Sequence, residues 1–179
     1  MRTRSWASVV ATVGLTLGSS GCFMAAPPAV GENDAAASDS ARCFEPDDAE
    51  TLADQVLQLV NLERGEAGLP PVVVNPALGK VASDFACSMI EDGFFDHHDP
   101  ADGSGPGERA VAEKYAFFAI GENLAAGQDS PADVMRLWME SPSHQAVILD
   151  ERWTEVGIAV RTGGEFGIYW VQEFGDPTE

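Results

Sequence analysis

Apolar residues recur at helical spacing in the first half of the chain. From Leu52 to Val60 they return every three or four positions, which predicts a helix near the start of a domain that opens at about Pro46. A second helical pattern follows Asn75, a capping residue with proline next to it in the first turn, and ends at Gly93. Two amphipathic helices are therefore expected before residue 94.

The middle of the chain alternates loops with shorter elements. Residues 100–107 are rich in Gly and Pro and predict a loop, followed by a short helix over 108–115 and a strand over 116–120. A third helix begins at Ser130, with Pro131 in its first turn and Asp133 near its positive end. Pro142 ends this helix, and a new helical turn can begin just after it.

Polar and apolar residues alternate over 155–161 and 166–174, the pattern of two half-buried strands. The Thr-Gly-Gly-Glu sequence between them, at 162–165, is a turn signal, so the two strands are expected to form a hairpin. Helices on either side of a small antiparallel sheet make a layered α+β domain, which is the fold class that the pattern predicts.

The first 45 residues do not follow this pattern. Arg2 and Arg4 precede a short apolar run over 6–18, and small residues lead to Cys22, as in a bacterial lipoprotein signal. Ser19 stands where such signals usually have Leu, so ordinary secretory cleavage nearby is the alternative. We expect a signal peptide over 1–21, an acylated Cys22, a disordered tether over 22–45 and a domain over 46–176. Both versions place the domain outside the cytoplasm, either lipid-anchored to a membrane or secreted.

The net charge of −19 argues against polyanions as binding partners. So acidic a surface repels nucleic acid phosphates, and direct nucleic acid binding is not expected. The membrane would be reached through the N-terminal lipid rather than through a basic surface.

The three cysteines are an odd number. If Cys22 is acylated, Cys43 and Cys87 remain, and in an oxidising compartment they can form a disulfide. Closing that loop would stabilise the fold by about 3–4 kcal/mol. The alternative is that Cys87 is a buried free thiol on a helix.

Histidine is scarce, and its positions indicate a site. All three histidines of the 179 residues lie in polar stretches marked by Gly or Pro, together with a Gly-Glu-Asn tripeptide at 121–123. Two imidazoles and one carboxylate suit a divalent ion such as zinc, with a fourth position left open. The residues that could form such a site are His97, Glu122 and His144.

Seven short motifs together carry a resemblance to the CAP superfamily, which contains the cysteine-rich secretory, antigen 5 and pathogenesis-related proteins. The resemblance covers residues 51–175 and is closest to the bacterial single-domain extracellular type. In chain order the motifs are VNLER at 60–64, GLPP at 68–71, GFFDH at 93–97 with Pro100, GENLA at 121–125, Trp138 with SPSH at 141–144, EVGI at 155–158 and YWVQEFG at 169–175.

The resemblance implies a three-layer α-β-α sandwich and a cleft with two His and two Glu. The first His stands three residues before proline, which selects His97 over His98, and the first Glu is Glu122. The second His follows Ser-Pro-x and is His144. Ser141 occupies the position of the second Glu, and Glu140 lies one residue earlier, on another face of the helix. This chain is therefore similar to a reduced, bacterial form of the pattern.

Each proposed site residue also has a structural interpretation. His97 could make a structural hydrogen bond in its loop, and His144 could pack against Trp138 at the start of a helix. Glu122 could bridge backbone amides, or orient a histidine ring rather than bind metal itself. Asn123 is expected to hydrogen-bond the backbone and shape the cleft, next to Glu140 and Ser141.

Three functions are compatible with these residues. The first, which the sequence favours, is a binding module whose cleft holds a divalent metal, zinc before others, or an extracellular lipid, sterol, glycan or peptide. The second is a metal-dependent hydrolase of an envelope or extracellular polymer, in which Glu122 would be the catalytic base. The third is a structural envelope protein. The resemblance does not give a reaction, because the family has no single agreed activity.

Overall fold

The structure is a computed structural model that describes residues 42–178. Its centre is a four-stranded sheet in the order β1-β3-β4-β2. The strands are β1 (Val73–Val74), β2 (Phe117–Ala126), β3 (Glu155–Gly163) and β4 (Gly167–Pro177). β4 pairs antiparallel with both β2 and β3, whereas β1 pairs parallel with the start of β3. β2 is therefore one edge of the sheet.

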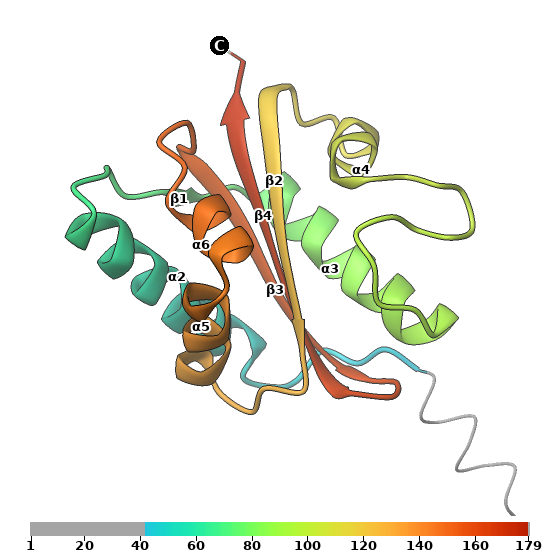
Figure 1. The fold of residues 1–179 in the computed structure, drawn as a ribbon. Coiled ribbons are helices and arrows are strands. Elements are labelled where there is room, and N and C mark those ends of the chain that lie inside the picture. Colours follow the sequence, from blue (N-terminus) through green and yellow to red (C-terminus); the bar gives the residue numbers. More distant parts are fainter. Residues whose placement is uncertain (1–41, 179) are drawn as a thin grey trace, which may run out of the picture. The chain divides into compact units, whose positions relative to one another are not determined.

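Helices cover both faces of this sheet, as Figure 1 shows. One face carries α2 (Ala49–Glu66), α5 (Pro131–Glu140) and α6 (Pro142–Ile148), and the other carries α3 (Pro76–Asp92) and α4 (Pro106–Ala112). The predicted three-layer α-β-α sandwich is confirmed. The two-residue β1 makes the sheet mixed, because its pairing with β3 is parallel.

Alternate side chains of β4 point to opposite faces of the sheet and so belong to two separate hydrophobic cores. Trp170 and Phe174 pack into the cluster formed with α2 and α5, and Tyr169 and Val171 pack against α3. Successive side chains of a strand point to opposite faces, so a central strand covered on both sides must be apolar at nearly every position. Glu173, fully buried on the α3 face, breaks this rule.

The boundaries of α3, α5 and α6 follow the local signals in the sequence, whereas α4 spans Pro106–Ala112 instead of the expected 108–115. The Asn75 side chain accepts hydrogen bonds from the first backbone amides of α3, and Gly93 ends that helix with φ of 69°. The Ser130 side chain caps α5 through the amide of Asp133. Pro142 ends α5 and begins α6, because proline fits the first helical turn but not the interior.

One strand is longer than the sequence pattern predicts. The strand expected over 116–120 continues to Ala126, so the Gly-Glu-Asn tripeptide lies within β2 rather than in a loop. The reason is tertiary: a continuous register with β4, from Ile120 opposite Gly175 to Ala126 opposite Tyr169, holds this polar segment extended. The strand β1 is another element that the sequence pattern did not predict.

A disulfide and a pair of backbone hydrogen bonds attach the start of the domain to the rest of the fold. Cys43 and Cys87 form the predicted disulfide, which joins this segment to α3. Phe44 exchanges two backbone hydrogen bonds of 2.9 Å with Thr162, so residues 42–45, part of the expected tether, lie against β3. The expected signal peptide, acylated Cys22 and tether as far as residue 41 lie outside the described residues. Within 42–178, no helix is both long and apolar enough to cross a membrane.

Candidate functional site

His97 lies in the loop after α3, and the core fixes that loop at its start. The neighbouring Phe94 packs on Phe85 of α3 with ring centroids 5.9 Å apart, which holds the chain where it leaves the helix. Arg109 of α4 donates a hydrogen bond of 3.1 Å to the backbone carbonyl of His97. The His97 side chain is about half exposed, at 49%. One edge of the ring therefore contacts the protein while the other remains accessible.

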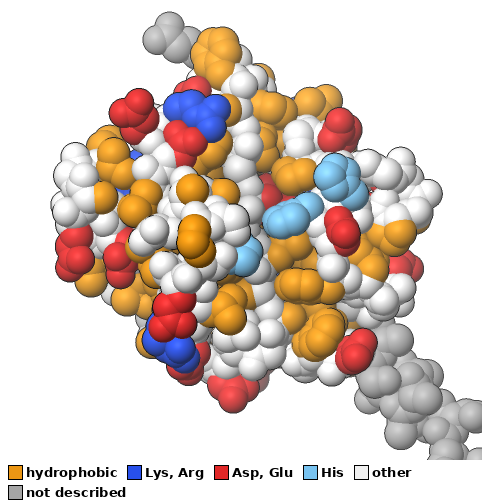
Figure 2. Space-filling view, in the orientation of Figure 1, with side chains coloured by type: hydrophobic (Ala, Val, Ile, Leu, Met, Phe, Trp, Pro, Cys, Tyr) orange, Lys and Arg blue, Asp and Glu red, His pale blue; other side chains and the backbone are white. Residues whose placement is uncertain are grey.

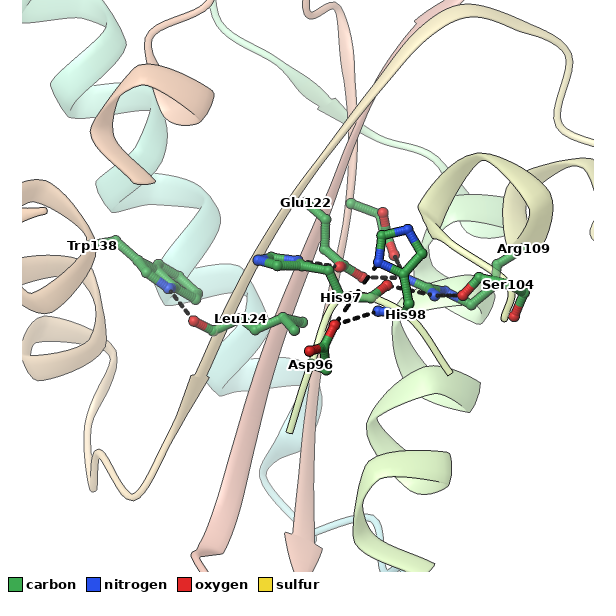
Figure 3. A network of polar contacts seen from close by, with 9 residues as sticks. Asp96, His97, His98, Ser104, Arg109, Glu122, Leu124 and Trp138 are labelled. Carbon is green, nitrogen blue, oxygen red and sulfur yellow. Dashed lines mark hydrogen bonds and ion pairs between the residues drawn. The ribbon is translucent and has the colours of Figure 1, made fainter. Parts of the chain in front are cut away.

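Glu122 connects His97 to the protein interior. Its Oε1 lies 2.6 Å from Nδ1 of His97, and its Oε2 accepts a hydrogen bond of 2.5 Å from Arg109. Figure 3 shows the three side chains in line, contributed by the loop, β2 and α4. The hydrogen bond that His97 donates to Glu122 raises the pKa of His97, because the carboxylate favours the protonated ring. In the neutral ring, Nδ1 keeps the proton and Nε2 is free to accept.

Arg109 is held between two acids and an aromatic ring. It contacts Glu122, lies 3.6 Å from Oε1 of Glu173, and stacks over Phe85 at 3.4 Å from the ring centroid. Planar stacking and a forked set of donors are properties of arginine that lysine lacks. The guanidinium group thus fixes the carboxylate that in turn orients His97.

Glu173 is a buried acid that the sequence reasoning missed. It lies on β4 directly opposite Glu122 and is completely buried. Burial, and then the charge of Glu122, raises the pKa of Glu173 well above its ordinary value. Neither of its oxygens accepts a hydrogen bond from the described residues. A protonated Glu173 fits both the raised pKa and the lack of accepted hydrogen bonds, because the protonated carboxyl group can donate to Glu122. The signal in the sequence is a Gln-Glu pair within the apolar run 169–175.

His144 lies in the first turn of α6 and lines the same cleft as His97. Burial lowers the pKa of His144, and the nearby His97 adds to the lowering, so the ring favours the neutral form. Its Nδ1 is buried and has no hydrogen-bond partner among the described residues. A neutral imidazole with a free ring nitrogen is able to bind a ligand.

Asn123 joins β2 to the His144 turn. It is fully buried, and its Nδ2 donates to the backbone carbonyl of His144 at 3.2 Å and to Gln172 at 3.3 Å. Because neighbouring residues of a strand point to opposite faces, Glu122 serves the His97 side of the sheet and Asn123 the His144 side. Of two successive residues in the Gly-Glu-Asn motif, Glu122 thus holds the ring of His97 and Asn123 holds the backbone of His144.

The other two residues expected near the cleft lie at its margin or outside it. Ser141 forms the junction between α5 and α6, where its hydroxyl lies 3.1 Å from that of Ser143. Glu140 is exposed and lies 3.7 Å from Arg136 on its own helix, with its side chain beside a different hollow next to α2.

The cleft has a volume of about 400 Å³ and a mixed lining. Besides the two histidines and Asp96 it is lined by Phe95, Leu124, Ala125, Ala126, Gln128 and Leu137. Figure 2 shows the histidine side chains gathered on one face with hydrophobic side chains beside them. Apolar walls with a few polar groups are typical of a ligand-binding cleft.

The cleft offers two side-chain donors for a metal ion and not a complete set of ligands. No cluster of three or more His, Cys, Asp or Glu side chains within 42–178 is arranged to hold a metal ion. Both oxygens of Glu122 are already engaged, which leaves Nε2 of His97 and a ring nitrogen of His144 as donors. These two imidazoles could bind a divalent ion whose remaining positions are filled by water or a ligand.

These features define an α-β-α sandwich with a two-histidine cleft. The profile of the family described as CAP, the cysteine-rich secretory protein family, matches residues 57–174, and the chain belongs to this family. It is 32% identical over 129 residues to protein YkwD of Bacillus subtilis (strain 168), covering 72% of this chain and 49% of the relative. The chain thus spans about half the length of that relative.

Two solved structures have the same fold. An outer surface protein from Borrelia burgdorferi superposes with a TM-score of 0.68 and 21% identity, over 75% of this chain and 98% of that protein. An extracellular protein containing an SCP domain, from Bacillus anthracis strain Ames, superposes with a TM-score of 0.63 and 26% identity. That match covers 71% of this chain and 41% of the other.

Proposed function

We propose that this chain is an extracytoplasmic binding module whose ligand occupies the cleft shared by His97 and His144. The observation that carries the proposal is the contrast between the two imidazoles. His97 is oriented through Glu122 and Arg109, whereas His144 keeps a buried ring nitrogen without a partner among the described residues. Both residues line one cleft whose other walls are largely apolar, so a ligand bound there would lie beside two imidazoles.

The location outside the cytoplasm is part of the same proposal. The Cys43–Cys87 disulfide is of a kind that persists in oxidising compartments. The two solved relatives are described as an outer surface protein and an extracellular protein. A lipid on Cys22 would anchor the domain, with residues 23–41 as the spacer.

Zinc is the divalent ion that best suits two neutral imidazoles. Nε2 of His97 and a nitrogen of His144 would hold it, while Glu122 would keep the His97 ring oriented. Such an orienting contact typically changes metal affinity about 10- to 100-fold. A bound ion would supply Lewis acidity toward an oxygen of the ligand.

A metal-dependent hydrolase has less support from the geometry. Glu122, its expected base, has one oxygen on His97 and the other on Arg109, and its side chain is only 1% exposed, so an attacking water has little access to it. We therefore place Glu122 as a residue that positions His97.

Calorimetric titration of the purified protein with zinc chloride tests the proposal. We expect micromolar or tighter binding that is lost in both His97→Ala and His144→Ala and weakened about tenfold or more in Glu122→Gln. His98→Ala is the matched control, because His98 is exposed and lies outside the cleft lining. A folded wild type that binds no zinc would remove the metal from the proposal. Loss of folding rather than of binding in His144→Ala would favour the structural envelope protein.

A further inference from the structure

The cleft between the two histidines exposes an open edge of the sheet. β2 is the last strand in the sheet order, and Leu124, Ala125 and Ala126 of this strand line the cleft. Within 42–178, no strand pairs with the outer side of β2. An unpaired strand edge is a template to which another extended chain can hydrogen-bond.

The register with β4 shows which backbone groups point into the cleft. The amide of Gly127 donates to the carbonyl of Ile168 at 2.8 Å, and in an antiparallel pair alternate residues face the partner strand. Counting back from Gly127, Ala125 and Asn123 therefore bond to β4, while Ala126 and Leu124 point their amide and carbonyl groups outward. The Leu124 carbonyl confirms this direction, since it accepts a hydrogen bond of 3.1 Å from the Trp138 indole (Figure 3).

Most of the outward backbone groups have no partner within the protein. Trp138 satisfies the Leu124 carbonyl, but the amide of Leu124 and both groups of Ala126 have no hydrogen-bond partner among the described residues. Two residues that line the same cleft, Gln128 and His144, each carry a buried side-chain atom without a partner in this part of the chain, Oε1 and Nδ1 respectively. Backbone groups of a strand edge without a protein partner are free to bond to a ligand that is itself polar along its length.

We infer that the cleft binds an extended peptide, which adds to the sheet as a strand along the outer edge of β2. This inference rests on the proposed binding role of the cleft and names its ligand class. A lipid tail cannot supply hydrogen bonds, whereas a peptide backbone repeats its donors and acceptors every two residues, the same repeat as the outward groups of β2. The alternate side chains of the peptide would then reach the two walls of the cleft.

The walls specify the side chains of the peptide. Phe95 is 44% exposed and meets Phe166, 45% exposed, edge to face at 5.8 Å, so the pair offers an apolar surface at the rim. Asp96 lies beside it with an exposed carboxylate, on a chain of net charge −19. The fitting ligand is a peptide with apolar residues at alternate positions and a net positive charge.

Selection from a displayed library of random dodecapeptides on the purified protein tests the ligand class. Chelator is present throughout, so that zinc binding does not contribute. We expect enriched sequences that alternate apolar and basic residues, and selected peptides that lose at least tenfold in affinity when alternate backbone amides are N-methylated. N-methylation removes donors and leaves the side chains in place. No enrichment, or equal binding of the methylated peptides, would overturn the inference.

A substitution in β2 tests the position of the peptide. Ala126→Pro deletes one outward amide and leaves the bonds to β4 in place, because proline is tolerated where its nitrogen faces away from the ladder. We expect at least tenfold weaker peptide binding in Ala126→Pro and a clearly smaller loss in Ala126→Ser, which keeps the amide and changes only the side chain. In the wild-type complex the amide protons of Leu124 and Ala126 should gain protection from exchange, measured by NMR. Unchanged exchange at both amides would show that the peptide binds elsewhere.

The inference and the proposed function can fail separately. Zinc binding that depends on both histidines, with no peptide selected, would leave the metal cleft and remove the peptide. The wild type could bind peptide in the presence of chelator, lose this binding in Ala126→Pro, and show no affinity for zinc. That result would support a peptide site on β2 and remove the metal from the proposal. Peptides that bind Ala126→Pro as tightly as the wild type contradict the inference whatever zinc does.

Discussion

Single buried polar residues connect distant parts of this protein. Arg64 of α2 is fully buried, and its guanidinium group donates to the backbone carbonyls of Pro70, Ile148, Asp150 and Trp153 at 2.8–3.1 Å. Those carbonyls belong to the segment before β1, to the end of α6 and to the loop that leads from α6 to β3. At the other polar centre, Arg109 and Glu122 fix His97. Both arginines work through several fixed donors at once, which a single ammonium group cannot reproduce.

The Arg64 contacts predict a large loss of stability on truncation. Arg64→Ala should lower the free energy of unfolding by about 3 kcal/mol or more, because several buried carbonyls lose their donor. Arg152→Ala is the control: Arg152 is exposed and pairs with Asp150 at the surface, so its loss should cost about 1 kcal/mol or less. Urea denaturation of both variants measures the difference. Similar losses would mean that Arg64 is not the anchor described.

Glu173 predicts a pH dependence of stability. Its pKa is raised in the folded state, so above the pKa of an unfolded glutamate, about 4.3, the native protein holds a proton that the unfolded chain has released. Stability that depends on this proton is present below that pH and is lost as the pH rises toward the folded pKa, by up to about 1.4 kcal/mol per pH unit. Glu173→Gln should remove this part of the slope, because an amide does not titrate.

Denaturation at a series of pH values, from mildly acidic to mildly alkaline, checks this prediction. As the pH rises, the free energy of unfolding of Glu173→Gln should increase relative to that of the wild type. Glu165 lies in an exposed turn, so Glu165→Gln should show the same pH dependence of stability as the wild type. A constant difference between wild type and Glu173→Gln would show that Glu173 is ionised in the folded protein throughout this range.

At the scale of elements, the absence of a side chain at Gly157 allows α3 to lie close to β3. A Cβ placed on Gly157 of β3 would lie 2.0 Å from the Leu78 carbonyl carbon of α3, so the helix backbone rests directly on the strand. This close approach lets the start of α3 pack where β1 also joins β3. A glycine was needed there for space, not for an unusual backbone angle.

Two alanine substitutions at this contact should have opposite effects. Gly157→Ala should cost about 3 kcal/mol or more, because the clash is with main chain that cannot rotate away. Gly79→Ala, within α3, meets nothing within 4 Å and should stabilise by about 0.5–1 kcal/mol through helix propensity. Thermal denaturation followed by circular dichroism compares the two. A stable Gly157→Ala protein would mean that α3 can move away from the sheet at little cost.

At the scale of the whole molecule, the disulfide attaches the beginning of the domain to its centre. Cys43 is 44 residues from Cys87, and the bond, with the Phe44–Thr162 bridge, fixes the chain before α2 against α3 and β3. If the protein is anchored through its N-terminus, this is also the point where tension from the anchor would enter the fold.

Replacing both cysteines measures that attachment. The double variant Cys43→Ser with Cys87→Ser should lose about 4 kcal/mol of unfolding free energy, the entropy of closing a loop of this length. Wild type unfolded in the presence of a reductant should match the double variant, and the reductant should not affect the double variant. A loss below about 1 kcal/mol would show that the packing of residues 42–48 holds this segment without the bond.

The sequence by itself determined the layered fold and the ends of α3 and α5, and it placed His97 and His144 among the candidate site residues. Those features rest on local physics, since capping residues, proline, glycine and apolar spacing act within a few positions, and the family motifs marked His97 and His144. The tertiary structure decided what non-local pairing controls. The register between β2 and β4 turned a polar tripeptide into strand, set Glu173 opposite Glu122, and left the outer edge of β2 open beside the histidines. No spacing along the chain encodes those contacts, because they join residues about 50 positions apart through hydrogen bonds that form only when the sheet does.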